Sequence, residues 1–180
     1  MKWRFIYRGL KARYRDQKQE ICALIKNLKS DAIAVDVGAN KGSYLWSLSR
    51  SVPNGQVYAF EPQPLLADYL KSACGAAGLG NVTIVQKGVS NREGILSLAI
   101  PGGKDTSPGA SFEDAVKKRE SCKFIDVATI TLDEFFQQKK GVIGALKIDV
   151  EGHELSVLKG ASEILQRHKP VVLCEAEQRH

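Results

Sequence analysis

The chain has 180 residues, which suits one domain with a hydrophobic core of its own. Its composition, 43% hydrophobic and 26% charged, is that of a soluble globular protein, and no apolar run has the roughly 20 residues of a membrane-spanning helix. The formal charge of +6 resides in residues 1–18, where seven Lys and Arg residues accompany one acid, Asp16, so the rest of the chain is neutral.

The first 30 residues are predicted to form a basic helical arm ahead of a main domain at 31–180. Aromatic residues are interleaved with the basic ones in this arm, and we expect them to pack on the domain: Trp3, Phe5, Tyr7 and Tyr14. A weak contact with an anionic surface is the alternative for the arm. A nucleic-acid partner is not expected, because only the arm favours one.

The arm begins with basic residues that no apolar segment follows, which argues against a secretory signal. The four cysteines are widely spaced and form no C-x-x-C pair. This spacing argues against a zinc ribbon and favours reduced thiols, so we expect a cytoplasmic protein.

Five short apolar runs alternate with segments of helical periodicity, which predicts a mostly parallel, doubly wound α/β sheet. The predicted core strands are residues 32–37, 57–60, 82–85, 145–150 and 171–174. The predicted helices are residues 21–28, 43–50, 64–73, 132–138 and 153–167. Two further strands, near 94–100 and 124–130, are expected to form an antiparallel excursion around a loop rich in Gly, Pro and Ser.

Ligands of such sheets bind beyond the carboxyl ends of the strands, so the strand ends identify the candidate site. The first strand ends in DVGANKG, residues 36–42, in which Asp36, Gly38, Ala39, Asn40 and Gly42 are the candidates for cofactor contacts. A dinucleotide fingerprint needs G-x-G-x-x-G, and the second and third glycines are missing. The spacing is instead similar to motif I of methyltransferases.

The second and third strand ends complete this candidate cofactor site. Glu61 follows the second strand about 20 residues after the glycine turn, where a carboxylate can accept both hydroxyls of a ribose, and Pro62 ends that strand. Gly88 and Val89 follow the third strand, where contacts with adenine are expected.

The fourth strand end gathers three acids and a histidine, and supplies the candidate catalytic residues. Asp149 is expected beside the reacting groups, since the first and fourth strands should be neighbours. His153 and Asp149 rank together as the general base, with Glu151 as a further candidate. Glu151 and Glu154 are alternatively explained as caps of the following helix. No metal site is predicted, although Asp149 and Glu151 have the chemistry to hold a hard cation.

In order along the chain, VDVGANKGS (35–43), AFEP (59–62) and LKIDVEGHELSVLKGA (146–161) resemble the signatures of the FkbM family of S-adenosylmethionine-dependent methyltransferases. GAS at 109–111 is similar to a turn of that family. The resemblance implies a Rossmann-like class I methyltransferase fold, S-adenosyl-L-methionine as cofactor, and O-methylation of a hydroxyl on a sugar, polyketide or other small molecule. It places the methionine part at residues 36–42, the ribose at Glu61, and the acceptor at Asp149, Glu151 and His153.

Related folds continue beyond the fifth core strand with a helix and two more strands, for which a chain ending at His180 has no room. We therefore expect a sheet without those C-terminal strands. A module that binds the cofactor without catalysis, or a fragment of an enzyme, is the alternative to a complete methyltransferase. A nucleic-acid methyltransferase is a third interpretation.

Overall fold

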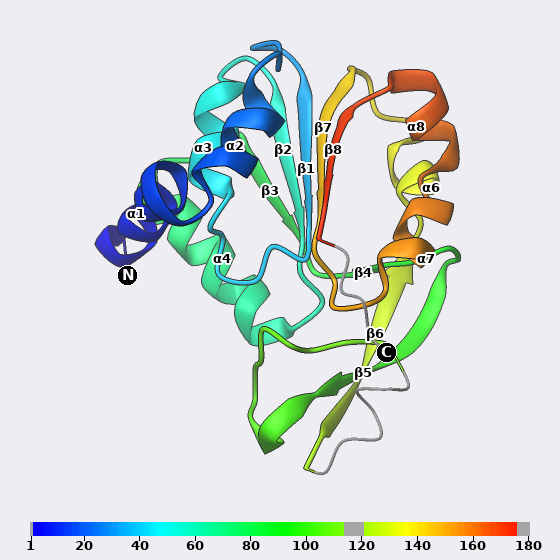
Figure 1. Cartoon of the computed structure of the whole chain (residues 1–180). Coiled ribbons are helices and arrows are strands. Elements are labelled where there is room, and N and C mark those ends of the chain that lie inside the picture. Colours follow the sequence, from blue (N-terminus) through cyan, green and yellow to red (C-terminus); the bar gives the residue numbers. More distant parts are fainter. Residues whose placement is uncertain (1, 114–120, 176–180) are drawn as a thin grey trace.

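The computed structural model describes residues 2–113 and 121–175, and its centre is a sheet of five parallel strands in the order β3-β2-β1-β7-β8 (Figure 1). These strands are β1 (Ile33–Val37), β2 (Gln56–Phe60), β3 (Val82–Val85), β7 (Ile143–Ile148) and β8 (Val171–Cys174). The order changes direction at β1, which pairs with β2 on one side and β7 on the other. The predicted doubly wound parallel sheet, with the first and fourth core strands adjacent, is confirmed.

Helices cover both faces of this sheet (Figure 1). One face carries α1 (Lys2–Lys11), the π-helical turn η1 (Ala12–Asp16), α2 (Lys18–Ile25), α3 (Leu45–Ser51) and α4 (Pro64–Ala77). The other face carries α6 (Leu132–Phe136), α7 (Glu154–Lys159) and α8 (Ser162–His168). The apolar run of β1 is buried throughout because successive side chains enter two different cores: Ala34 packs with Leu45 and Leu70, and Val35 with Leu146 and Val157.

The N-terminal segment is helical, as predicted, and it packs on the sheet layer rather than standing apart from it. Phe5 is fully buried in the same core as Leu45 and Leu70, and Ile21 of α2 joins it. The expectation that all the aromatic residues pack on the domain is wrong, because Trp3, Tyr7 and Tyr14 are 78%, 65% and 69% exposed. These residues lie away from the buried side of the N-terminal helices, where Phe5 is the one aromatic residue among them that enters the core.

The excursion forms a second sheet that lies beyond the carboxyl ends of the main strands (Figure 1). Its strands are β4 (Gly88–Val89), β5 (Gly94–Ile100) and β6 (Lys123–Ile130), and the 3-10 turn η2 (Pro101–Gly103) follows β5. The predicted antiparallel pairing of β5 with β6 is confirmed. The two-residue strand β4, which pairs in parallel with β6, was not predicted.

One predicted helix, residues 153–167, is instead two helices that separate between Lys159 and Ser162. At the break Gly160 approaches so closely that a Cβ there would lie 2.1 Å from the Ser90 carbonyl oxygen. The new helix α8 is capped by Asp133 of α6, whose carboxylate accepts hydrogen bonds from the backbone N–H groups of Glu163 and Ile164. Leu155, predicted to face inward, is 64% exposed, because the buried side of α7 is the one that carries Val157, two residues further along the helix.

Candidate functional site

The turn after β1 is the first part of the site, and its backbone conformation requires glycine at Gly38. This residue has φ +77°, and a Cβ on it would lie 1.8 Å from the carbonyl oxygen of Asp149. The N–H groups of Gly38 and Ala39 both donate to the carbonyl oxygen of Phe60, at 3.0 Å. The turn is therefore locked between the ends of β2 and β7, which places Ala39 and Asn40 at the carboxyl edge of the sheet.

Glu61 is the second part, and it is a buried carboxylate with unused acceptor capacity. It is 2% exposed, and its two oxygens accept hydrogen bonds from the backbone N–H groups of Asn40 at 2.8 Å and Gln63 at 2.9 Å. Burial raises the pKa of Glu61 to about 7, against the opposing effect of these two bonds. A carboxylate has about four lone-pair sites, so two acceptor sites remain for the hydroxyls of a ribose.

Lys147 joins the first and fourth strand ends through their acids. Its Nζ is 3.1 Å from Asp36 Oδ1 and 3.3 Å from Asp149 Oδ2, and it donates to the Gly38 carbonyl oxygen at 2.9 Å. Burial disfavours its charge, but Asp36 and Asp149 outweigh burial and raise the pKa of Lys147. Asp36 is 1% exposed and neither of its oxygens accepts a well-aligned hydrogen bond, so its contact with Lys147 is an ion pair.

These groups surround two adjoining hollows at the switch point of the sheet. A narrow one of about 100 Å³ lies between the ends of β1, β2 and β7 and the second sheet, and Glu61, Gly88 and Phe112 are among its walls. A wider one of about 260 Å³ lies over the turn after β1. Gly38, Asn40 and Asp149 line both hollows. An elongated ligand with a nucleoside end and a polar end therefore has a continuous place beside Asp149, whose side chain is 34% exposed.

His153 lies away from these hollows in a buried hydrogen-bond chain. Its Nε2 is 2.9 Å from Ser90 Oγ, its Nδ1 is 2.8 Å from Glu113 Oε1, and its ring meets the edge of Phe112. The residue is 8% exposed. Both ring nitrogens have partners, so the imidazole ties the second sheet and its loop to the turn after β7.

Of the other two acids in the turn after β7, Glu151 lines the narrow hollow and Glu154 binds the backbone. Glu151 lines the narrow hollow and has φ +54°, in the left-handed region, and its carbonyl oxygen accepts a 2.7 Å hydrogen bond from Ser111 Oγ. Glu154 accepts a 2.8 Å bond from the Gly152 N–H, which agrees with its interpretation as a local cap. Ser111 belongs to the GAS turn, so this turn is fastened directly to the strand end that carries Asp149.

The structure brings most of the predicted cofactor residues to the two hollows: Gly38, Ala39, Asn40, Glu61, Pro62, Gly88, Val89 and Asp149. Asp36 and Gly42 lie outside them. Gly42 instead provides close packing, since a Cβ there would lie 2.7 Å from the Phe5 ring and 2.9 Å from Leu70.

Sequence reasoning missed several residues of the site, chiefly Gln63, Lys147, Pro108 and Phe112. The signal for Lys147 was its position two residues before Asp149, on the same side of a strand, and opposite Asp36 in the parallel register. Gln63 exchanges two hydrogen bonds with Ser107, in the loop between β5 and β6. That contact spans 44 residues and has no local sequence signal.

Among the residues that the structure describes, no group of three His, Cys, Asp or Glu side chains is arranged to hold a metal ion. In the same residues no helix combines the length and the apolar character needed to cross a membrane.

Comparison with known proteins places the chain in a family. Residues 36–180 match the model of the methyltransferase FkbM domain. Methyltransferase sdnD of Sordaria araneosa is 31% identical across 83% of this chain and 68% of its own length. Hexuronic acid methyltransferase AglP of Haloferax volcanii is 31% identical across 84% of this chain and 59% of its own length.

A solved structure, the methyltransferase FkbM of Methylobacillus flagellatus, superposes with a TM-score of 0.58 at 19% identity, over 83% of this chain and 34% of that one, which shows the shared fold. The chain thus spans about two thirds or less of each of these proteins. With the domain model matched over most of the chain and two relatives at 31% identity, the chain belongs to the FkbM methyltransferase family.

Proposed function

We propose that this chain binds S-adenosylmethionine and carries out O-methylation of a hydroxyl on a sugar, polyketide or other small molecule. The observation that carries the proposal is the meeting of Glu61, the turn at Gly38–Asn40 and Asp149 around two joined hollows at the switch point. The relatives are named as a methyltransferase and a hexuronic acid methyltransferase, which supports a small or sugar acceptor.

In this proposal the chain's residues divide the ligand between them. Glu61 accepts the ribose hydroxyls through its free lone pairs, Gly88 and Val89 flank the adenine, and Ala39 and Asn40 lie beside the methionine part. When bound, S-adenosylmethionine supplies a methyl group attached to a positively charged sulfur. Because that sulfur departs as a neutral thioether, no acid has to protonate the leaving group. The protein must then align the acceptor and remove its proton.

Asp149 is the best candidate for the group that receives the acceptor's proton. It lines both hollows, it is partly exposed, and it is held by Lys147, which is itself paired with Asp36. Glu151 lines the narrow hollow and remains a second candidate. For His153 we propose a positioning role, because both ring nitrogens are hydrogen-bonded and the side chain lines neither hollow.

Binding of S-adenosylhomocysteine by calorimetry is the direct test of the cofactor claim. Glu61→Ala should weaken binding by about tenfold or more, since a hydrogen-bonded charge contributes roughly 1.5–3 kcal/mol. Glu93→Ala, which removes an exposed carboxylate before β5, is the matched control and should bind like the unchanged protein. No binding at millimolar ligand, or equal affinities of the two variants, would refute the assignment.

The pH profile of methyl transfer separates the two views of His153. If Asp149 is the base, Asp149→Asn removes most of the turnover while S-adenosylhomocysteine still binds. His153→Gln retains the shape of the pH profile and loses activity only in proportion to its loss of stability. Disappearance of the acidic limb in His153→Gln, with unchanged stability, would make the histidine the base instead.

A further inference from the structure

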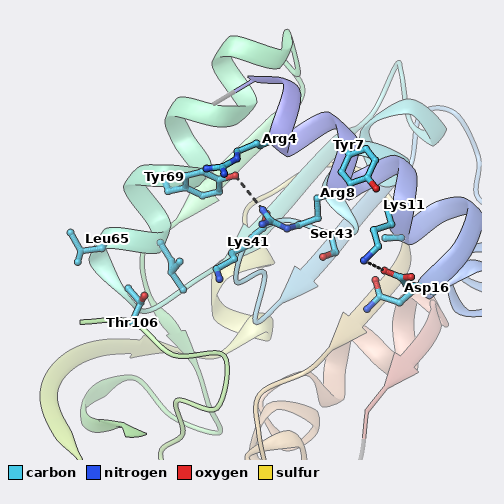
Figure 2. Close-up of a pocket in the computed structure, with 13 residues that line it drawn as sticks. Arg4, Tyr7, Arg8, Lys11, Asp16, Lys41, Ser43, Leu65, Tyr69 and Thr106 are labelled. Carbon is cyan, nitrogen blue, oxygen red and sulfur yellow. Dashed lines mark hydrogen bonds and ion pairs between the residues drawn. The ribbon is translucent and has the colours of Figure 1, made fainter. Parts of the chain in front are cut away.

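An open hollow of about 800 Å³, next to the site above, lies between α1, α4 and the turn after β1 (Figure 2). Four basic side chains line it: Arg4, Arg8, Lys11 and Lys41. The only acid among its lining residues is Asp16, which is already held by Lys11 at 2.9 Å and Arg15 at 2.8 Å. The hollow is therefore strongly electropositive.

The basic row is built into α1 by its sequence spacing. Arg4, Arg8 and Lys11 recur every three or four residues and so share one side of the helix, while Phe5, Gly9 and Ala12 repeat one position later on its buried side. A Cβ on Gly9 would lie 2.5 Å from the Trp46 side chain, so α1 packs very closely against α3. This close packing fixes the direction in which the basic row points.

Arg8 is also fastened from the opposite wall. Its Nη1 donates to the Tyr69 hydroxyl of α4 and to the Lys41 carbonyl oxygen, both at 3.2 Å (Figure 2). Arg4 and Lys41 have no carboxylate within ion-pair distance among residues 2–113 and 121–175. Two cationic groups thus face the hollow without a counter-charge, beside a third whose guanidinium is held in place.

Helix α4 adds to the positive potential of the hollow. Its first turn, with Leu65 and Leu66, forms part of the wall and contains no acid. A helix of 14 residues presents partial positive charge at this end. Tyr7, Tyr69 and Leu65 supply apolar surface on which the uncharged remainder of a ligand can rest.

The hollow is continuous with the proposed methyl-transfer site. Arg8, Lys41 and Ser43 line both this hollow and the one over Gly38–Asn40 that Asp149 also lines. A ligand group held by the basic row is therefore close to the place where we put the methyl donor. Figure 2 shows the Arg8 guanidinium reaching across the hollow toward Tyr69.

We propose that this hollow is an anion subsite for the acceptor, which takes a carboxylate or a phosphate group, so that the substrate is an acidic small molecule such as a sugar acid or a sugar phosphate. The proposal rests on the proposed function in so far as the bound anion belongs to the acceptor. An anion recognised here would meet the exposed Arg4 beside Arg8, whose guanidinium is half-buried and held by Tyr69 and the Lys41 carbonyl oxygen.

Titration calorimetry with three probes tests the subsite: inorganic phosphate, glucuronate and, as the neutral counterpart, glucose. We expect phosphate and glucuronate to bind in the millimolar range or tighter, with affinity falling as salt is added, and glucose to give no heat. Arg4→Gln with Lys11→Gln should weaken anion binding by about tenfold. The matched control, Lys18→Gln with Lys29→Gln, removes the same charge from exposed positions outside the hollow and should change it by less than about twofold.

The same titrations with S-adenosylhomocysteine distinguish failure of this proposal from failure of the proposed function. Both double variants should bind S-adenosylhomocysteine as the unchanged protein does, and a bound anion should not compete with it. Equal anion binding by the two double variants overturns the subsite. So does competition between phosphate and S-adenosylhomocysteine, which would assign the basic row to the cofactor's own carboxylate. Absence of S-adenosylhomocysteine binding with anion binding intact refutes the cofactor claim alone.

Discussion

We expect Glu61 to link cofactor binding to pH, because our proposal places this deeply buried carboxyl at the ribose of the cofactor. Its pKa is raised from the ordinary 4.5 to about 7 because the side chain is 2% exposed. A shift of this size corresponds to about 3 kcal/mol between the two protonation states. In the free protein the carboxylate is therefore half neutral at about pH 7, although the ribose hydroxyls need its ionised form as their acceptor.

Two opposite pH dependences follow from this one group. A raised carboxyl pKa means that the folded state holds its proton more tightly than the unfolded state, so its contribution to stability is greatest below pH 4.5 and is lost as pH rises through 7. Affinity for S-adenosylhomocysteine should run the other way, rising about tenfold from pH 6 to pH 8 as Glu61 ionises, and levelling above.

Calorimetric titrations at pH 6, 7, 8 and 9, paired with urea unfolding at the same pH values, measure both trends. Glu61→Gln cannot ionise, so it should abolish the pH dependence of binding and should lack the loss of stability, up to about 3 kcal/mol, that the unchanged protein shows between pH 4 and pH 8. At pH 4 the variant should be the less stable of the two, because its side-chain NH2 cannot accept the hydrogen bond that one Glu61 oxygen accepts from a backbone N–H. An affinity that stays constant between pH 6 and pH 8 in the unchanged protein would refute the reasoning, because Glu61 would then either be ionised throughout or take no part in binding.

Three other outcomes are expected from the geometry of the site and its supports. In urea titrations Gly38→Ala should lower the free energy of unfolding by about 3 kcal/mol or more, because the new Cβ meets the Asp149 carbonyl oxygen. The control Gly78→Ala, at a similar φ of +72° but with open space around it, should lower it by about 1 kcal/mol. Lys147→Met should cost about 3–5 kcal/mol by leaving Asp36 buried without its cation, and adding Asp36→Asn should recover part of the loss. Ser90→Ala should slow turnover less than Asp149→Asn, since Ser90 acts only through His153.

The fold was predictable because its strands are short apolar runs buried on both faces. The apolar run that ends at Val37 predicts a central strand, because its side chains alternate between the two faces of the sheet and each face is covered by a hydrophobic core. Where the prediction was wrong, the cause lies in contacts between distant segments. Within residues 153–167 only Gly160 indicates a break, and the contacts that produce it come from the distant Ser90 and Asp133.

In the candidate site, too, local patterns were predictable and contacts between distant segments were not. Glu61, Gly38 and Asp149 were found because a strand end fixes where they must lie, and the parallel sheet then collects all three ends at one edge. Phe112 and Pro108 come from the loop of the second sheet, whose position depends on pairings that the local sequence does not encode. For the basic hollow, the sequence indicated only the positive charge of residues 1–18. The basic side of α1 forms a hollow only because α4 lies opposite it, and the local sequence does not encode that arrangement.

The placement of His153 has a consequence for how the acids are used. Of the three acids at this strand end, Asp149 pairs with Lys147 and Glu154 accepts a hydrogen bond from the Gly152 N–H. His153, in the same turn, binds Glu113 from the loop of the second sheet. Asp149 is left as the acid that both hollows share, with a fixed cation on one flank and open space on the other. Lys147 holds Asp149 Oδ2 at 3.3 Å, and in our proposal this carboxylate receives the proton of the acceptor's hydroxyl. In our proposal the histidine network acts by holding the second sheet against this strand end, which keeps Asp149 beside the hollow where we place the acceptor.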